Sequence, residues 1–177
     1  MRALVLVVVA CSGGDVDLEG KQCPCADGYA CDTSTNLCRP TDGDGNRRVI
    51  VFDANTGQYK RHWGAYGNKP DDVPPQKYDP RIPSKQFGSV HGVIISRDGL
   101  VYVNDRLNNR IQIFQRDGTF VKEFSINRQT RALGSAFASA FSADPAQTYL
   151  YNADGMNQVI DVIKRDTLQI VSAIGGG

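Results

Sequence analysis

The feature that most constrains the fold is an internal repeat in the second half of the chain. Residues 102–124 and 151–173 align without gaps at a constant offset of 49 residues. The matched positions carry polar turn residues, apolar residues and a charged pair: Asp105 with Asp154, Asn108 with Asn157, Ile111 with Ile160, Ile113 with Val162, and Arg116-Asp117 with Arg165-Asp166. A third, partial copy lies upstream, where Arg48–Phe52 parallels Arg110–Phe114. A fixed offset of this size is typical of repeat architectures, in which each unit packs on its neighbours.

Each unit predicts four short strands. In the first unit we expect strands at residues 91–96, 100–104, 110–115 and 119–124. The pairs Asp98-Gly99 and Asp117-Gly118 and the polar stretch 107–109 separate them, which is typical of antiparallel hairpins. No segment has a helical period. One such four-stranded meander is one blade of a propeller.

We therefore expect an all-β fold, a partial β-propeller of about two and a half four-stranded blades at residues 42–177, with a small disulfide-rich segment before it. The last two strands of one blade fall at 47–64, and whole blades fall at about 88–125 and 135–174. Between the partial blade and the first whole blade, residues 65–87 contain five prolines. Prolines at this density cannot join a strand ladder, so the stretch predicts a long surface loop.

The predicted ring is incomplete, because a closed propeller needs at least four blades. The chain is then a fragment of a larger propeller, the product of a truncated or recombined gene, or a protomer that completes its ring with another copy. Open blade edges favour association. We expect self-association through two open terminal faces that carry Val49, Val51, Val162 and Ile170.

The N-terminus has the features of an export signal. Met1-Arg2 precedes an apolar run, Ala3–Val9, that is too short to span a bilayer. The run ends in Val8-Val9-Ala10-Cys11, which resembles the lipobox of bacterial lipoproteins. The resemblance implies a signal at residues 1–11, a lipidated Cys11 and a membrane anchor in the bacterial cell envelope. The alternative is a buried apolar strand with a free cysteine. Residues 12–20 are small and polar and indicate a tether.

Four further cysteines lie within residues 21–40: Cys23, Cys25, Cys31 and Cys38. An even set in an exported chain predicts two disulfides. Three connectivities are possible, and pairing Cys23 with Cys25 is the least favoured on geometry. The stretch CPCADGYAC is similar to the second half of an EGF-like module, and we assign it no function. A zinc site is the alternative, although paired C-x-x-C spacing is missing.

Charge excludes one class of partner. The net charge is +1, and acidic and basic residues are interspersed. Proteins that bind nucleic acid carry a basic patch or stripe, and this chain has neither. We expect no nucleic-acid partner.

The unit HGVIISRDGLVYVNDRLNNRIQIFQRDGTFVKEF resembles the NHL repeat along its whole length, and the signature is the stretch from Asp105 to Arg110. The second unit departs from it, with Val159 in place of the arginine. The resemblance implies a binding or interaction scaffold with a protein, peptide or glycan ligand on one propeller face. The candidate ligand-binding residues are Asp105, Arg106, Asn109 and Arg110. Alternatively, Asp105, Asn109 and Arg110 make turn and inter-blade contacts, and Arg106 is a solvated turn residue.

The chain also resembles the propeller of the peptidyl-α-hydroxyglycine amidating lyases. In that family, histidines opening several blades bind zinc. Val90-His91-Gly92-Val93 has a matching context, and Arg106 matches an active-site arginine. However, Asp44 stands where the catalytic tyrosine should be, and the chain has two histidines, whereas zinc catalysis normally needs three protein ligands. We expect no catalytic residue and no cofactor in this chain.

His91 is the single candidate metal ligand; otherwise it is a structural residue near the central channel. Zinc or calcium is expected only in a complete propeller. The alternative function is a metal-dependent lyase or hydrolase that is active only in a complete ring.

Overall fold

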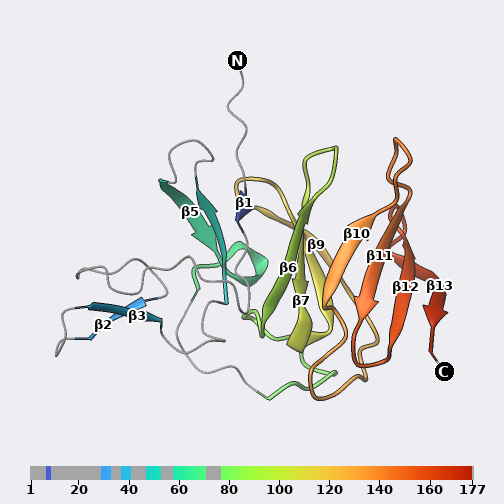
Figure 1. Ribbon diagram of the computed structural model, residues 1–177, viewed down its shortest axis with the longest axis horizontal. Coiled ribbons are helices and arrows are strands. Elements are labelled where there is room, and N and C mark those ends of the chain that lie inside the picture. Colours follow the sequence, from blue (N-terminus) through green and yellow to red (C-terminus); the bar gives the residue numbers. More distant parts are fainter. Residues whose placement is uncertain are drawn as a thin grey trace.

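The structure is a computed structural model. It describes residues 47–52, 58–70 and 77–176, together with the backbone of three short strands, β1 (Val7–Val8), β2 (Tyr29–Asp32) and β3 (Leu37–Pro40). Within this part the chain is all-β, apart from two single-turn 3-10 helices, η1 (Ala65–Gly67) and η2 (Arg106–Asn108). The sheets from β4 onward follow one another in chain order (Figure 1).

The first of these sheets is the half-blade, with strand order β1-β4-β5. β4 (Val49–Phe52) pairs antiparallel with β5 (Tyr59–Trp63), and these are the two strands predicted at 47–64. The short strand β1 pairs with the other edge of β4, with Val7 opposite Val51. Successive side chains of β4 alternate between buried and partly buried, which is the two-residue period of a strand with two different faces.

Blade 1 is a four-stranded antiparallel meander in chain order: β6 (Val90–Ile95), β7 (Val101–Asp105), β8 (Arg110–Phe114) and β9 (Phe120–Ser125). The predicted Asp-Gly turns close its hairpins, and Gly118 has a φ of +97°. A Cβ at this position would lie 2.9 Å from the Trp63 ring of the half-blade. Gly118 is therefore required both by the backbone of the turn and by the packing between sheets.

Blade 2 repeats this meander, with β10 (Ala138–Phe141), β11 (Tyr149–Asp154), β12 (Val159–Lys164) and β13 (Gln169–Gly175). The connector, residues 126–137, joins the two blades. The innermost strands β6 and β10 are neighbours (Figure 1). The strand positions agree with those expected from the repeat, and the prediction of an all-β partial propeller is confirmed.

Two apolar cores hold the three sheets together. The first lies between the half-blade and blade 1 and contains Val49, Val51, Trp63, Ala65, Phe87, Val90, Val101, Val103 and Phe114. The second lies between blades 1 and 2 and contains Tyr102, Ile111, Ile113, Ile126, Ala136, Leu150 and Ile163. Full burial of one such large apolar side chain contributes about 1.5–3 kcal/mol. Stability therefore comes mainly from contacts between neighbouring units, as in other repeat folds.

One expectation about the open faces is wrong. Val49 and Val51 are completely buried in the first core and do not lie on a terminal face. Strand alternation turns them toward blade 1, whereas Ile50 and Phe52 on the same strand are only partly buried. At the other end of the chain, Ile170 is 41% exposed, but the equivalent Val121 of blade 1 is 39% exposed although blade 1 has a neighbour on each side. The exposure of Ile170 therefore does not identify an open face.

Most of the N-terminal predictions concern residues outside the described part of the chain. These are Cys11, Cys23, Cys25 and the tether. The hairpin β2–β3 places the backbones of Cys31 and Cys38 opposite one another, at a Cα spacing that suits a disulfide. The two disulfides and the export signal stay predictions. The described residues contain no helix of the length and apolar character needed to cross a membrane.

Candidate functional site

Asp105, at the end of β7, organises the turn between β7 and β8 of blade 1. Its side chain is completely buried. Oδ1 accepts hydrogen bonds from the backbone amides of Gly88 (2.8 Å) and Ser89 (3.2 Å), and Oδ2 accepts from Asn108 Nδ2 (2.8 Å) and Arg110 Nε (2.8 Å). The carboxylate thus joins the chain entering β6 to the turn between β7 and β8.

Arg110 extends this network to the Pro-rich loop, residues 65–87. Nη1 donates to the Ser84 carbonyl (2.9 Å) and to the Tyr66 hydroxyl (2.8 Å), and Nη2 donates to the Gln86 carbonyl (2.9 Å). Burial by itself would lower the pKa of Arg110, but the neighbouring charge of Asp105 contributes to a net rise. The guanidinium therefore stays charged and fixes the loop onto blade 1.

Asn109 joins blade 1 to the connector. It has a left-handed backbone (φ +50°) and is completely buried. Oδ1 accepts from the Ser135 amide (2.8 Å) and hydroxyl (3.0 Å), and Nδ2 donates to the Thr130 carbonyl (2.8 Å). Asp105, Asn109 and Arg110 thus make the turn and inter-blade contacts that were one of the two interpretations. A role for these three residues in ligand binding stays a prediction.

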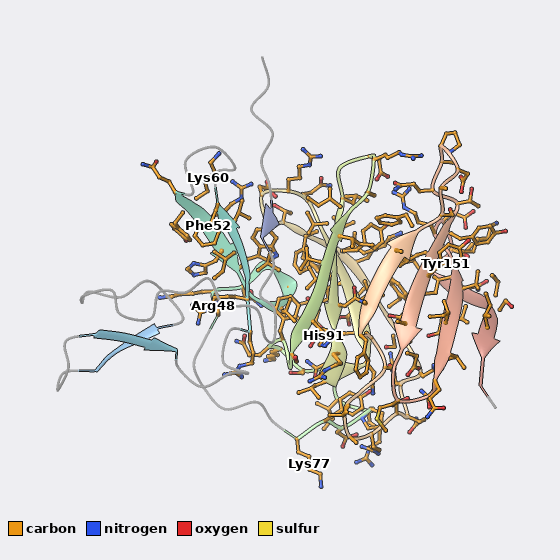
Figure 2. All side chains as sticks on the ribbon, viewed as in Figure 1. Arg48, Phe52, Lys60, Lys77, His91 and Tyr151 are labelled. Carbon is orange, nitrogen blue, oxygen red and sulfur yellow. The ribbon has the colours of Figure 1, made fainter. Side chains whose placement is uncertain are left out.

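His91 and Arg106 meet at one side chain, Phe137, on the segment that leads into β10. The His91 ring packs edge-on against Phe137 (5.1 Å between centroids), and the Arg106 guanidinium lies 5.2 Å from the centroid of the same ring. His91 Nδ1 is 2.7 Å from the Phe137 carbonyl oxygen. Since a carbonyl can only accept, Nδ1 carries the proton, and Nε2 is the nitrogen left for any further partner. Figure 2 shows His91 on β6.

These contacts give His91 a structural role where the inner strands β6 and β10 meet. No group of three or more His, Cys, Asp or Glu side chains in the described part of the chain is arranged to hold a metal ion. The junction also depends on Gly134, which has a φ of +77°. A Cβ there would lie 1.9 Å from the Arg106 carbonyl oxygen, so only glycine lets the connector pass this close.

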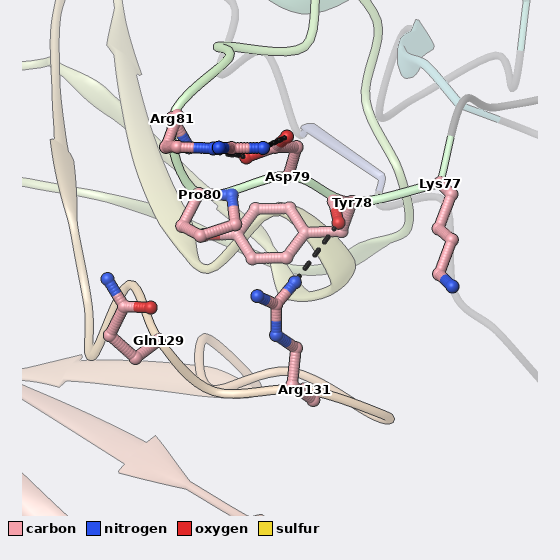
Figure 3. A pocket seen from close by; sticks show the side chains of 7 residues that line it. All are labelled: Lys77, Tyr78, Asp79, Pro80, Arg81, Gln129 and Arg131. Atoms are coloured by element: carbon pink, nitrogen blue, oxygen red, sulfur yellow. Dashed lines mark hydrogen bonds and ion pairs between the residues drawn. The ribbon is translucent and has the colours of Figure 1, made fainter.

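The structure also forms a site that the sequence did not predict. The cationic cleft, with a volume of about 580 Å³, lies between the Pro-rich loop and the connector (Figure 3). Its lining residues are Lys77, Tyr78, Asp79, Pro80, Arg81, Gln129 and Arg131. The two sides of the cleft are about 50 residues apart in sequence, and no local pattern links them.

Contacts between the two sides hold the cleft in shape. The Tyr78 hydroxyl donates to the Arg128 carbonyl (2.7 Å), and Arg131 Nη1 donates to the Tyr78 carbonyl (3.3 Å). The Arg131 guanidinium lies 6.0 Å from the centroid of the Tyr78 ring, at the outer limit for a cation–π contact. Tyr78 is therefore tied to the connector at both ends.

The charge of the cleft is positive. It contains three cationic side chains, Lys77, Arg81 and Arg131, and one carboxylate, Asp79. Two hydrogen bonds from the Arg81 guanidinium (2.7 and 3.0 Å) and one from its backbone amide hold the pKa of Asp79 well below its ordinary value. Asp79 and Arg81 neutralise each other, so Lys77 and Arg131 supply the excess charge.

A second, smaller cleft lies at the outer rim between the blades, and its side chains contact one another. Arg165 packs over the rings of Tyr102 (5.8 Å) and Phe141 (5.4 Å), donates to the Tyr102 hydroxyl (3.0 Å), and pairs with Asp98. These groups satisfy one another. We interpret this region as a contact that fastens blade 2 to blade 1.

A solved structure shares this arrangement of sheets. Hydrazine synthase from Kuenenia stuttgartiensis superposes with a TM-score of 0.50 at 13% identity, over 75% of this chain and 30% of that one. A protein of unknown function from Bacteroides caccae superposes with a TM-score of 0.46 at 10% identity, over 72% of this chain and 38% of that one. No protein-family model and no curated protein matches the chain.

The chain is a sector of a β-propeller. The chain-order meanders and the neighbouring inner strands support this, and the first likeness agrees. At 13% identity that likeness shows the fold and says nothing of function. The chain spans well under half the length of either structure that it matches.

Proposed function

We propose that this chain is part of a binding scaffold of the NHL type, and that the cationic cleft holds an anionic ligand. The observation that carries the proposal is the excess charge of Lys77 and Arg131 in the lining of the cleft, with Arg131 beside the ring of Tyr78. Loops on a rigid scaffold are common binding sites. The rigid parts here are the two blades, and Arg110 fixes the Pro-rich loop onto the first of them.

The ligand that fits this chemistry carries carboxylates next to an apolar or ring surface. Lys77 and Arg131 would pair with the carboxylates, and Tyr78 and Pro80 would provide the apolar contact. An acidic protein segment and an acidic glycan both have this character. Because these cations are exposed, their attraction for the ligand is screened by salt.

Binding can be measured by fluorescence anisotropy with a labelled hexaglutamate peptide and, in parallel, a labelled oligogalacturonate. We expect binding of at least one probe that weakens as salt rises from 50 to 300 mM. Lys77→Glu and Arg131→Glu should each raise Kd about tenfold, which is about 1.4 kcal/mol. The matched control is Lys85→Glu, an exposed lysine of the same loop outside the cleft.

Either of two results would overturn the proposal. One is the absence of binding of both probes at low salt. The other is an equal loss of affinity in Lys85→Glu, because a general effect of net charge would then explain the binding.

No observation favours the lyase or hydrolase alternative, and we do not propose it for this chain. His91 uses Nδ1 to bind a backbone carbonyl, and Arg106 packs on the same phenylalanine that His91 contacts. The place of the scaffold on the bacterial cell envelope is part of the proposal and rests on the lipobox-like Cys11. Fractionation of cells that express the wild type or Cys11→Ser tests it separately, and an equally soluble wild type would contradict the anchor.

A further inference from the structure

Blade 2 leaves one side of its sheet uncovered by any other described residue. The C-terminal face, defined as the side of blade 2 turned away from blade 1, contains Tyr149, Tyr151, Ile160, Val162 and Ile174. These positions alternate with the buried Leu150, Asn152, Asp161 and Ile163 of the same strands. Ile160 is 38% and Ile174 is 61% exposed, and the two are cross-strand partners. An apolar sheet face of this kind marks an interaction surface.

The repeat indicates what covers such a face. In blade 1, the residues equivalent to Tyr151, Ile160 and Val162 are Tyr102, Ile111 and Ile113. These three residues are buried in the second core, against Leu150 and Ile163 of blade 2. In the half-blade, the residues equivalent to Ile111 and Ile113 are Val49 and Val51, and these are buried against blade 1. In the half-blade and in blade 1, these equivalent positions form an interface with the next unit. In blade 2, the same positions are not covered by another described unit.

The opposite side of this interface is also present on the chain. On the third strand of each blade, Phe114 in blade 1 and Ile163 in blade 2 are among the residues that face the preceding unit. Both are completely buried. The equivalent residue of the half-blade is Phe52, which is only partly buried. Its cross-strand partner Tyr59 is 54% exposed, and the two rings are 6.4 Å apart. We call this side of β4 and β5, with Ile50, Phe52 and Tyr59, the N-terminal face.

We propose that a second copy of this chain covers the C-terminal face with its own N-terminal face, in a head-to-tail contact. The two faces are the two sides of the interface that already joins the half-blade to blade 1 and blade 1 to blade 2. They lie at opposite ends of the molecule, where Figure 2 labels Phe52 and Tyr151. A head-to-tail contact leaves one face free at each end of a pair, so it continues into a ring if the rotation closes and into a filament if it does not.

Sedimentation velocity over a hundredfold range of concentration tests the proposal. All samples use the full chain with Cys11→Ser, so that a lipid anchor cannot drive association. We expect the weight-average mass of the parent to rise with concentration. Ile160→Arg and, as a second variant of the same face, Ile174→Arg should weaken association at least tenfold. Tyr59→Arg, on the other face, should do the same.

The decisive sample is a mixture. Ile160→Arg keeps its N-terminal face and Tyr59→Arg keeps its C-terminal face, so the two monomeric variants should form a 1:1 pair that grows no further. This recovery also shows that both variants are folded. The matched control is Val121→Arg, because Val121 lies on β9 of blade 1 with 39% exposure, close to that of Ile160, and belongs to neither face.

Three results would overturn the proposal. The first is a parent that stays monomeric at every concentration, which would leave the face for a further blade or another protein. The second is Tyr59→Arg that associates as strongly as the parent, which indicates a symmetric contact between two C-terminal faces. The third is a mixture of two folded variants, verified by circular dichroism, that does not form the pair.

Discussion

Blades 1 and 2 have the same strand order, but they stabilise the turn after the second strand by different chemistry. In blade 1, the buried Asp105 pairs with Arg110 at 2.8 Å. In blade 2, Val159 replaces Arg110, and among the described residues no arginine pairs with the equivalent Asp154. Asp154 Oδ2 accepts instead from Asn157 Nδ2 (2.7 Å) and from the Asn127 side chain of the connector (2.6 Å).

The difference follows from what each turn has to hold. Arg110 is long enough to reach beyond Asp105 to the carbonyls of Ser84 and Gln86, so it also fastens the Pro-rich loop. Blade 2 is preceded by the shorter connector, and short amide side chains suffice there. The acidic residue at the end of the second strand is thus common to both blades, whereas the partner depends on the segment that comes before the blade. Three predictions test this comparison.

The largest effect should follow the loss of the arginine. Arg110→Met keeps most of the side-chain length but leaves the Asp105 carboxylate buried without a cation. We expect the free energy of unfolding, measured by urea denaturation, to fall by about 3–5 kcal/mol.

Adding Asp105→Asn should restore part of this loss, because it removes the uncompensated charge. The matched control Arg128→Met, at an exposed arginine, should change stability by less than about 0.5 kcal/mol. If Arg110→Met cost no more than the control, blade 1 would not depend on its ion pair, and the contrast with blade 2 would be wrong.

The second prediction compares the stability cost of a substitution at one equivalent position in the two turns. Asn109 in blade 1 and Gln158 in blade 2 both have left-handed backbones, with φ of +50° and +56°. Asn109 is buried and makes three side-chain hydrogen bonds to the connector, whereas Gln158 is exposed. We expect Asn109→Ala to lower the free energy of unfolding by about 2–3 kcal/mol, and Gln158→Ala by less than about 1 kcal/mol. Equal losses in thermal or urea unfolding would mean that backbone conformation, not the inter-blade contact, sets the cost.

The smallest effect concerns a buried carboxylate that only blade 2 has. Asp161 takes the place of the neutral Gln112 of blade 1. Burial and the nearby charge of Asp154 raise the pKa of Asp161, although a hydrogen bond from Asn152 opposes the rise. A carboxyl whose pKa is raised in the folded state stabilises the fold below its unfolded pKa of 3.8, and this contribution is lost as pH rises through the folded pKa.

Asp161→Asn should therefore be more stable than the wild type at pH 7, by less than about 1 kcal/mol, and the difference should shrink toward pH 3. The control is Asp166→Asn. Its exposed carboxylate has a pKa lowered by Lys164, so the wild type should lose a small contribution at this site as the pH falls. Urea midpoints measured at several pH values check both signs. A gain in Asp161→Asn that does not depend on pH would contradict the electrostatic cause.

The strands and turns could be predicted from the sequence because their signals are local. Asp98-Gly99 and Asp117-Gly118 require tight turns wherever the chain goes, and the apolar period between them predicts strands. The offset of 49 residues then predicted that both units have the same form. The ion pair of Asp105 and Arg110 lies within one turn, and its structural role was one of the two interpretations drawn from the sequence.

Only the tertiary structure decided which face of each sheet has a neighbour. A strand with alternating side chains has two faces, and the period of two residues does not say which of them meets the next unit. Val49 and Val51 were therefore assigned to an open face, although they are buried against blade 1. The cationic cleft, too, could not be predicted from the sequence. Tyr78 and Arg131 become neighbours because blade 1, which lies between them in sequence, has an even number of antiparallel strands and so returns the chain to the same end of the sheet. No local sequence pattern indicates such a contact.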